Sequence, residues 1–278
     1  MPPHSFSFRE RRITETDAVT MSEVTFPSPV TTTEPSNNTV HCEYFRPRSG
    51  EKMPGVIVLH ILGGDFPLAR LFCYSLARRN VAALFLKMPY YGPRRDPNSA
   101  RRMISKDPLE TVAGMTQAVL DIRHGTAWLA SRVEIDAERL GVFGISLGGI
   151  TGALAATAEP RLKNVCLVLA GGDIGQIVWE SPELEEIRNY WVQRGGTREE
   201  FLSAMKSIDP VSYAAGMRGR RVLMLNAKDD EVIRKPCTMS LWKAFGEPEI
   251  VWYDGGHYSA AWYIVDTLDR VPRFFRSP

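Results

Sequence analysis

The sequence lacks several features that would point to particular partners. Its 278 residues hold 34 Lys and Arg against 32 Asp and Glu, so a net charge of +2 creates no strong field toward nucleic acid or an anionic surface. No stretch approaches the roughly 20 apolar residues that cross a bilayer, and the N-terminal segment MPPHSFSFRERRITE lacks the apolar core of a secretory signal. We therefore expect a cytoplasmic protein without nucleic-acid or membrane partners.

Cysteine is scarce and scattered along the chain. There are four cysteines, and they form neither a Cys-x-x-Cys pair nor a cluster with histidine. Isolated thiols in apolar surroundings usually pack as small hydrophobic side chains. The sequence therefore predicts no metal site and no disulfide framework, and it predicts free, buried thiols at Cys42, Cys73, Cys166 and Cys237.

Short apolar runs, by contrast, are abundant and alternate with stretches of helical periodicity. A strand that is covered on both faces by helices has an unbroken run of apolar residues in its sequence. Such runs occupy residues 56–59, 81–86, 140–143, 165–169, 222–225 and 250–253. Helices between successive strands imply parallel pairing through right-handed crossovers. The pattern predicts an α/β fold with a mostly parallel, doubly wound sheet of about eight strands.

Two segments depart from this alternation. Residues 1–18 are polar and predict an N-terminal arm, followed by one domain over 19–278 in which residues 19–26 and 39–45 form antiparallel edge strands. Residues 173–215 carry helical character and no strand, which predicts an inserted helical cap. Insertions at the carboxyl ends of strands tend to cover the ligand crevice, so we expect this cap, with Trp179, to shape a substrate pocket. The alternative is a surface excursion whose aromatic residues only pack helices.

The segment Gly144-Ile145-Ser146-Leu147-Gly148 lies between an apolar run and a small-residue helix. A sharp turn from strand to helix presents a serine at its apex only if the residues two before and two after it are very small. Ser146 is therefore the candidate nucleophile, and the amide of Leu147 is a candidate oxyanion donor. The alternative is a serine that caps a helix after a glycine turn.

A serine nucleophile needs a histidine to take its proton and a carboxylate to orient that histidine. Of the five histidines, four fall in an arm, in an edge strand, at a strand end or within a helix, where structural roles are expected: His4, His41, His60 and His124. His257 remains, on a glycine turn just past the last core strand. Three carboxylates, Asp229, Asp230 and Glu231, follow the run 222–225.

The chain order serine, then aspartate, then histidine is that of the α/β-hydrolases, and residues 40–275 resemble this superfamily. The resemblance implies the α/β-hydrolase fold and a triad whose acid stands three residues after the end of the strand. Placing Ala227 at that end gives Asp230, with Asp229 as the alternative because the family's glycine is absent. Glu231 is then interpreted as a solvated surface charge.

The resemblance also suggests where a substrate binds. Residues 60–64, His-Ile-Leu-Gly-Gly, resemble the family's His-Gly-x-Gly-Gly loop, so Leu62 matches the second oxyanion donor, with Ile61 as the alternative. The loop after the second core strand adds four predicted substrate-binding residues, to which the cap adds Trp179: Tyr90, Tyr91, Arg94 and Arg95. The alternative for this loop is a surface turn with solvated arginines.

Together these features predict a serine carboxylesterase for small or medium acyl groups that needs no cofactor or metal and acts on a small-molecule ester. The stretch Asp-Asp-Glu-Val-Ile and the modest cap look similar to dienelactone-hydrolase-type and acetyl-esterase-type enzymes. A serine in place of the cysteine typical of dienelactone hydrolases favours esters over lactones. A thioesterase, a small prolyl-oligopeptidase-like peptidase and a non-catalytic hydrolase-fold binding protein are the alternatives, and the oligomeric state is left open.

Overall fold

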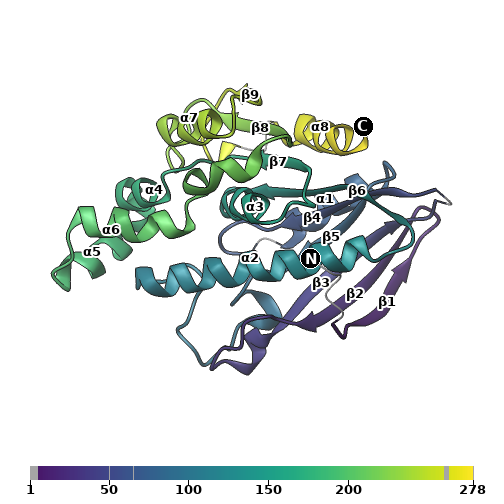
Figure 1. Ribbon diagram of the computed structural model, residues 1–278, viewed down its shortest axis with the longest axis horizontal. Helices are drawn as coiled ribbons and strands as arrows, with labels where there is room; N and C mark the ends of the chain where they lie inside the picture. The colour runs from purple at the N-terminus through teal and green to yellow at the C-terminus, as the bar shows by residue number, and fades with distance from the viewer. Residues whose placement is uncertain (1–5, 50, 65, 260–262, 278) are drawn as a thin grey trace.

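A single open sheet runs through the molecule, with helices packed on both of its faces (Figure 1). The computed structural model describes residues 6–49, 51–64, 66–259 and 263–277. Within them nine strands lie in the order β1-β2-β3-β5-β4-β6-β7-β8-β9. The strands are β1 Arg9–Glu15, β2 Val19–Pro27, β3 Thr39–Pro47, β4 Met53–Leu59, β5 Ala82–Leu86, β6 Ile135–Ile145, β7 Asn164–Val168, β8 Arg221–Ala227 and β9 Glu249–Tyr253.

The helices cover two separate apolar layers. The α-helices are α1 Phe66–Ala77, α2 Pro108–Ala130, α3 Leu147–Ala158, α4 Ile174–Glu180, α5 Glu185–Gln193, α6 Arg198–Met205, α7 Lys235–Ala244 and α8 Ile264–Arg276. Trp128 of α2 packs in the same apolar layer as Leu84 of β5, whereas Phe72 of α1 and Phe275 of α8 pack in the layer of Phe85. Because successive strand residues point to opposite faces, β5 supplies side chains to both layers.

Strand direction follows the predicted pattern. Strands β5, β4, β6, β7, β8 and β9 pair in parallel, whereas β1, β2 and β3 form an antiparallel extension that joins β5. Every residue of β4, β5 and β7 is buried, as expected for strands covered on both faces. The prediction of a mostly parallel, doubly wound sheet is confirmed.

The N-terminal segment differs from its prediction as a loose arm. Residues 9–15 form strand β1, which pairs antiparallel with β2, so β2 is not the edge of the sheet and the strands number nine rather than about eight. All seven residues of β1 are exposed, so neither face carries the apolar alternation that identifies a strand in sequence. Residues 1–5, and with them His4, lie outside the described residues.

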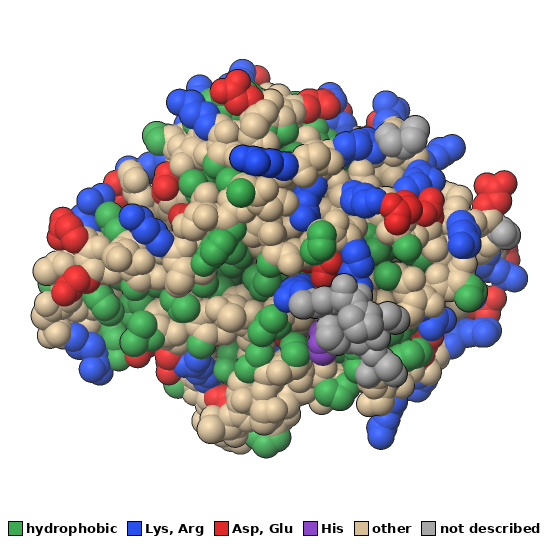
Figure 2. Space-filling view, viewed as in Figure 1, with side chains coloured by type: hydrophobic (Ala, Val, Ile, Leu, Met, Phe, Trp, Pro, Cys, Tyr) green, Lys and Arg blue, Asp and Glu red, His purple; other side chains and the backbone are tan. Residues whose placement is uncertain are grey.

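The segment between β7 and β8 projects to one side of the sheet (Figure 1). It contains α4, α5 and α6 together with the 3-10 turns η3 Pro182–Leu184, η4 Lys206–Ile208 and η5 Pro210–Met217. Helix α6 contacts α2, and η5 contacts α3, so the segment packs beside the helix that follows Ser146. Figure 2 shows apolar side chains gathered over α5 and α6 and along the hollow beside them. Two further 3-10 turns are η1 Pro35–Asn38 and η2 Gly92–Arg94.

The four cysteines are free and buried, as predicted. Burial raises the pKa of the Cys237 thiol to about 12 and places the pKa values of the other three thiols well above their usual range. No helix in the described part of the chain is long and apolar enough to cross a membrane.

Candidate active site

Ser146 occupies a sharp turn between β6, which ends at Ile145, and α3, which begins at Leu147. Its backbone has φ 52° and ψ −117°, a conformation that non-glycine residues rarely adopt. A Cβ atom on Gly144 would clash with the Gly148 carbonyl oxygen, and one on Gly148 would lie 2.7 Å from the His60 carbonyl oxygen. Both glycines are therefore required by the close approach of the strand, the turn and the helix.

Ser146, His257 and Asp230 form a continuous chain of hydrogen bonds. His257 Nε2 lies 3.0 Å from Ser146 Oγ, and His257 Nδ1 lies 2.8 Å and 3.0 Å from the two Asp230 carboxylate oxygens. The parallel pairing of β8 with β9 brings the loops that follow these strands together. The Asp230 side chain is 2% exposed, so its interaction with the imidazole is shielded from water.

The orientation of Asp230 is fixed by its own loop. Its Oδ1 atom accepts hydrogen bonds from the backbone N–H groups of Val232 at 3.0 Å and Ile233 at 2.6 Å. Asp229, the alternative acid, is exposed, and its backbone N–H donates to the Gly255 carbonyl at 3.1 Å. The structure therefore places Asp230, and not Asp229, on the candidate base.

His60 organises the loop that was predicted to supply the second oxyanion donor. The Met88 N–H donates to His60 Nε2 at 3.1 Å, so the ring hydrogen is on Nδ1, which donates to the Ile61 carbonyl at 2.8 Å. The Gly64 N–H also donates to this carbonyl, at 3.1 Å. Because C=O and N–H point in opposite directions across a trans peptide, these two donors fix the direction of the Leu62 N–H. Burial lowers the pKa of His60 to about 4, which keeps its ring neutral.

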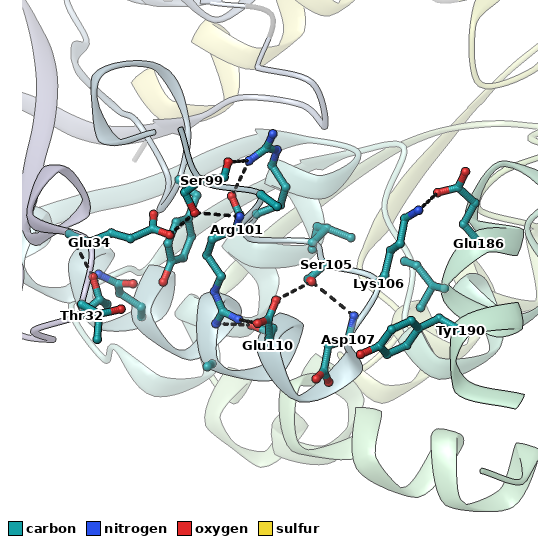
Figure 3. A pocket seen from close by; sticks show the side chains of 18 of the residues that line it. Thr32, Glu34, Ser99, Arg101, Ser105, Lys106, Asp107, Glu110, Glu186 and Tyr190 are labelled. Carbon is teal, nitrogen blue, oxygen red and sulfur yellow. Dashed lines mark hydrogen bonds and ion pairs between the residues drawn. The ribbon is translucent and has the colours of Figure 1, made fainter. Parts of the chain in front are cut away.

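Two neighbouring cavities lie on the Ser146 side of the sheet, and one of them is lined by Ser146. A narrow apolar cavity of about 80 Å³ is lined by Ser146 itself and by apolar side chains from several helices, among them Leu147, Met115, Ile177 and Phe201. A polar cavity of about 1150 Å³ lies beyond it (Figure 3). The two cavities share lining residues at their junction, which are Leu62, Ile104, Leu184 and Ile187.

The residues predicted to bind substrate lie in different places relative to the two cavities. Tyr90 lines the polar cavity, with its backbone N–H donating to Asn37 Oδ1 at 3.1 Å. Tyr91 packs on the His60 ring at 4.5 Å between centroids, and Trp179 packs on the Phe201 ring at 5.4 Å. Neither residue is among the described residues that line the two cavities, and each contacts the site only through its ring neighbour, His60 or Phe201.

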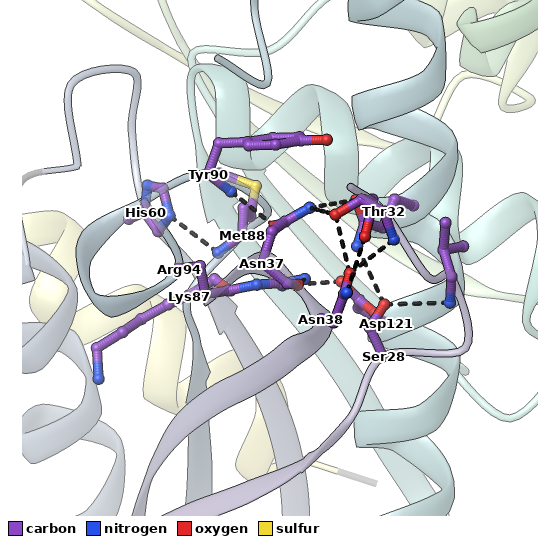
Figure 4. Close-up of polar contacts among 12 residues, drawn as sticks. Ser28, Thr32, Asn37, Asn38, His60, Lys87, Met88, Tyr90, Arg94 and Asp121 are labelled. Carbon is purple, nitrogen blue, oxygen red and sulfur yellow. Dashed lines mark hydrogen bonds and ion pairs between the residues drawn. The ribbon is translucent and has the colours of Figure 1, made fainter. Parts of the chain in front are cut away.

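The prediction that Arg94 binds substrate is wrong. Its side chain is 0% exposed and forms an ion pair with the buried Asp121 of α2 at 2.8 Å (Figure 4). Its guanidinium also donates to the carbonyl oxygens of Lys87 at 3.1 Å and Asn37 at 2.8 Å. Both terminal nitrogens of the Arg94 guanidinium are therefore bound by protein groups and do not face a substrate, which indicates a structural role. Arg95 is exposed and lines neither cavity among the described residues.

Glu231, interpreted from sequence as a surface charge, has a specific contact that sequence reasoning missed. It is exposed, yet its Oε2 atom accepts the backbone N–H of His257 at 2.9 Å and lies where a Cβ atom on Gly256 would clash. The hydrogen bond from His257 lowers the pKa of the Glu231 carboxyl. A glycine directly before the candidate base, facing an acidic residue next to the candidate acid, is the signal that could have revealed this contact.

We expect Glu231→Ala to lower kcat for an ester by about tenfold, because losing a hydrogen bond to a charged group loosens the loop that carries His257. Glu231→Gln should recover most of the loss, since its amide oxygen can accept the same N–H. Steady-state kinetics of the two variants, with thermal unfolding to check the fold, test this. Equal activity of the two variants would show that the contact does not position the histidine.

Two protein families match parts of the chain. Residues 1–173 match the family described as alpha/beta hydrolase domain containing 18, and residues 115–247 match the prolyl oligopeptidase family. Uncharacterized proteins from two strains of Mycobacterium tuberculosis are 30% identical over 174 residues, which cover 61% of this chain. The match spans 40% of the length of these relatives.

Solved structures share the fold over almost the whole chain. The acetyl xylan esterase from Paenibacillus sp. R4 has a TM-score of 0.75 at 19% identity, covering 97% of this chain and 89% of that one. Acetyl xylan esterase 1 from Thermoanaerobacterium sp. JW/SL YS485 gives 0.74 at 18%, covering 95% and 88%. A protein assigned as a dienelactone hydrolase from Klebsiella pneumoniae gives 0.62 at 20%, covering 99% and 100%. At these identities the likeness establishes the α/β-hydrolase fold alone.

Proposed function

The chain belongs to the alpha/beta hydrolase domain containing 18 family, and we propose that it is a serine carboxylesterase that acts through Ser146, His257 and Asp230. The observation that carries this proposal is the hydrogen-bonded series from the buried Asp230 carboxylate through His257 to the hydroxyl of a serine at a strained turn. These are the three roles, in the order acid, base and nucleophile, by which a Ser-His-Asp triad activates a hydroxyl at neutral pH.

The proposed reaction is acyl transfer through these three residues. His257 Nε2 takes the proton of Ser146 Oγ as this oxygen attacks the ester carbonyl, and Asp230 stabilises the imidazolium that forms. The backbone N–H groups of Leu147 and Leu62 are the proposed donors to the oxyanion, each worth about 3 kcal/mol of transition-state stabilisation. His257 then protonates the departing alkoxide, and a water molecule, activated in the same way, releases the acid from Ser146.

The apolar cavity supports a preference for short acyl groups. A volume of about 80 Å³ beside Ser146, enclosed by α2, α3, α4 and α6, favours an acetyl to butyryl group over a long chain. Nearly all of the enclosing side chains are apolar, and accommodating a longer chain in so small a volume would require them to move. The substrate we propose is a small-molecule ester, with neither cofactor nor metal assigned a role.

A peptidase is the second candidate, and the match of residues 115–247 to the prolyl oligopeptidase family is the observation that favours it. The same three residues would cleave a thioester or an amide. Relative rates therefore have to distinguish these activities, since the arrangement of the three residues does not.

We expect a fluorophosphonate probe to label the wild-type protein at Ser146 and to leave Ser146→Ala unlabelled. Among p-nitrophenyl esters, kcat/KM should be highest between acetate and butyrate and at least about tenfold lower for octanoate, because extra methylenes do not fit the apolar cavity. A thioester and a peptide p-nitroanilide serve as comparators. Faster cleavage of the anilide would favour the peptidase, and absence of labelling in folded protein would favour a non-catalytic binding protein.

A further inference from the structure

The large polar cavity has no role in the triad chemistry, and its position suggests one. It shares the lining residues Leu62, Ile104 and Leu184 with the apolar cavity at Ser146, so the two cavities lie side by side. Its walls come from the β2–β3 connection, the segment before α2, α2 itself and α5 (Figure 3). A volume of about 1150 Å³ is far more than a simple alcohol needs.

Two of the three cations that line this cavity form ion pairs with lining carboxylates. Arg101 forms an ion pair with Glu110, and Lys106 forms one with Glu186 at 2.8 Å. Arg102 donates to the backbone carbonyl oxygens of Ser99 at 2.8 Å and Arg101 at 2.7 Å. The remaining lining carboxylates are those of Glu34 and Asp107. Among the described residues, no two lining cations lack a partner, so the cavity has no free pair of cations of the kind that binds a carboxylate or phosphate.

One acceptor in the cavity is incompletely satisfied. Glu34 accepts a hydrogen bond from the Ser99 hydroxyl through Oε1, whereas its Oε2 atom is buried and has no hydrogen-bond partner among the described residues. A buried carboxylate oxygen without a donor is costly, so Glu34 favours a partner in the cavity that can donate a hydrogen bond. Hydroxyls of Ser99 and Ser105, and the rings of Tyr90 and Tyr190, surround the same space. Hydroxyl groups and flat apolar surfaces are partners for a neutral molecule that carries many hydroxyls.

We propose that the polar cavity binds the leaving alcohol of the substrate, and that this alcohol is a neutral, polyhydroxylated group such as a sugar. The substrate then has two unlike halves, with a short acyl group in the apolar cavity and a hydrophilic alcohol beyond Leu62 and Leu184. This inference rests on the proposed esterase function for its catalytic part, whereas the binding of the alcohol stands apart from catalysis.

The experiment compares esters that share one acyl group. Methyl 6-O-butyrylglucoside, hexyl butyrate and the butyryl ester of glycolate present a neutral polyol, an apolar alcohol and an anionic alcohol. We expect kcat/KM to be about tenfold or more higher for the glucoside than for either of the others. Glu34→Ala and Tyr190→Ala should each lower the ratio of glucoside to hexyl ester, by about fivefold or more for Glu34→Ala. Glu51→Ala, an exposed residue outside both cavities, should leave the ratio unchanged.

A binding measurement keeps the inference separate from the esterase proposal. Calorimetry with the Ser146→Ala variant gives the Kd of the butyrylglucoside without turnover, and adding Glu34→Ala should weaken it about fivefold or more. Tight, Glu34-dependent binding with no hydrolysis of any ester by the wild type would overturn the esterase and support the cavity. Rapid hydrolysis of p-nitrophenyl butyrate with no preference for the glucoside, or a preference for the glycolate ester, would overturn the cavity assignment and leave the esterase standing.

Discussion

Replacing Asp230 with asparagine is expected to lower kcat for p-nitrophenyl butyrate by about 10⁴-fold. Both carboxylate oxygens face His257 Nδ1, so the wild-type ring carries its hydrogen there and keeps Nε2 free to accept the Ser146 proton. An asparagine amide can instead donate to Nδ1 and stabilise the opposite tautomer, in which Nε2 carries the hydrogen. The amide oxygen can still accept from Val232 and Ile233, so the loop should keep its shape.

The neighbouring Asp229 provides the matched control. Its side chain is exposed, so Asp229→Asn should change kcat by less than about twofold, while thermal unfolding of both variants stays close to that of the wild type. Comparable losses at the two positions would contradict the assignment of Asp230. A loss confined to Asp229 would mean that the loop after β8 is shifted by one residue during turnover.

The Ser146 turn could be predicted from sequence because its physical requirements are local. Gly144 and Gly148 are excluded from carrying a side chain by contacts within the turn and with the adjoining strand, so the glycines mark the turn directly. The contact of His257 with Asp230 also follows from chain order, since β8 and β9 are neighbours and end at the same edge. The order of the parallel strands therefore made it possible to predict from sequence a contact between residues that lie far apart in the chain.

Features that depend on a distant partner could not be predicted in this way. Arg94 lies close to tyrosines in a loop at the catalytic edge of the sheet. Its ion-pair partner Asp121 lies far along the chain, within α2, so the local sequence does not reveal that Arg94 is buried. Glu231 contacts a backbone N–H, which leaves no trace in the identity of the partner residue. Strand β1 is held by backbone pairing with both faces exposed, so its sequence lacks the period of two that marks a half-buried strand.

Replacing Arg94 with alanine is expected to lower the free energy of unfolding by about 3–5 kcal/mol. The change leaves the Asp121 carboxylate buried without its ion-pair partner and removes the donors to the carbonyl oxygens of Lys87 and Asn37. Burial already raises the pKa of Asp121, and the Arg94 charge opposes that rise, so the variant should take up a proton at Asp121 at a higher pH than the wild type. Urea unfolding at two pH values measures both effects.

Arg95→Ala is the matched control, because Arg95 is exposed, and we expect it to change stability by less than about 0.5 kcal/mol. The double variant Arg94→Met/Asp121→Leu should recover much of the loss, since an apolar pair of similar size removes the unpaired charge. Similar small effects of Arg94→Ala and Arg95→Ala would show that the buried pair is not a structural anchor. Asn37 accepts a hydrogen bond from Arg94 and also one from the Tyr90 N–H, and Tyr90 lines the polar cavity. We therefore expect Arg94→Ala to lower kcat/KM for the butyrylglucoside as well as the stability. A loss of stability alone would show that Arg94 does not position the part of the loop that lines the polar cavity.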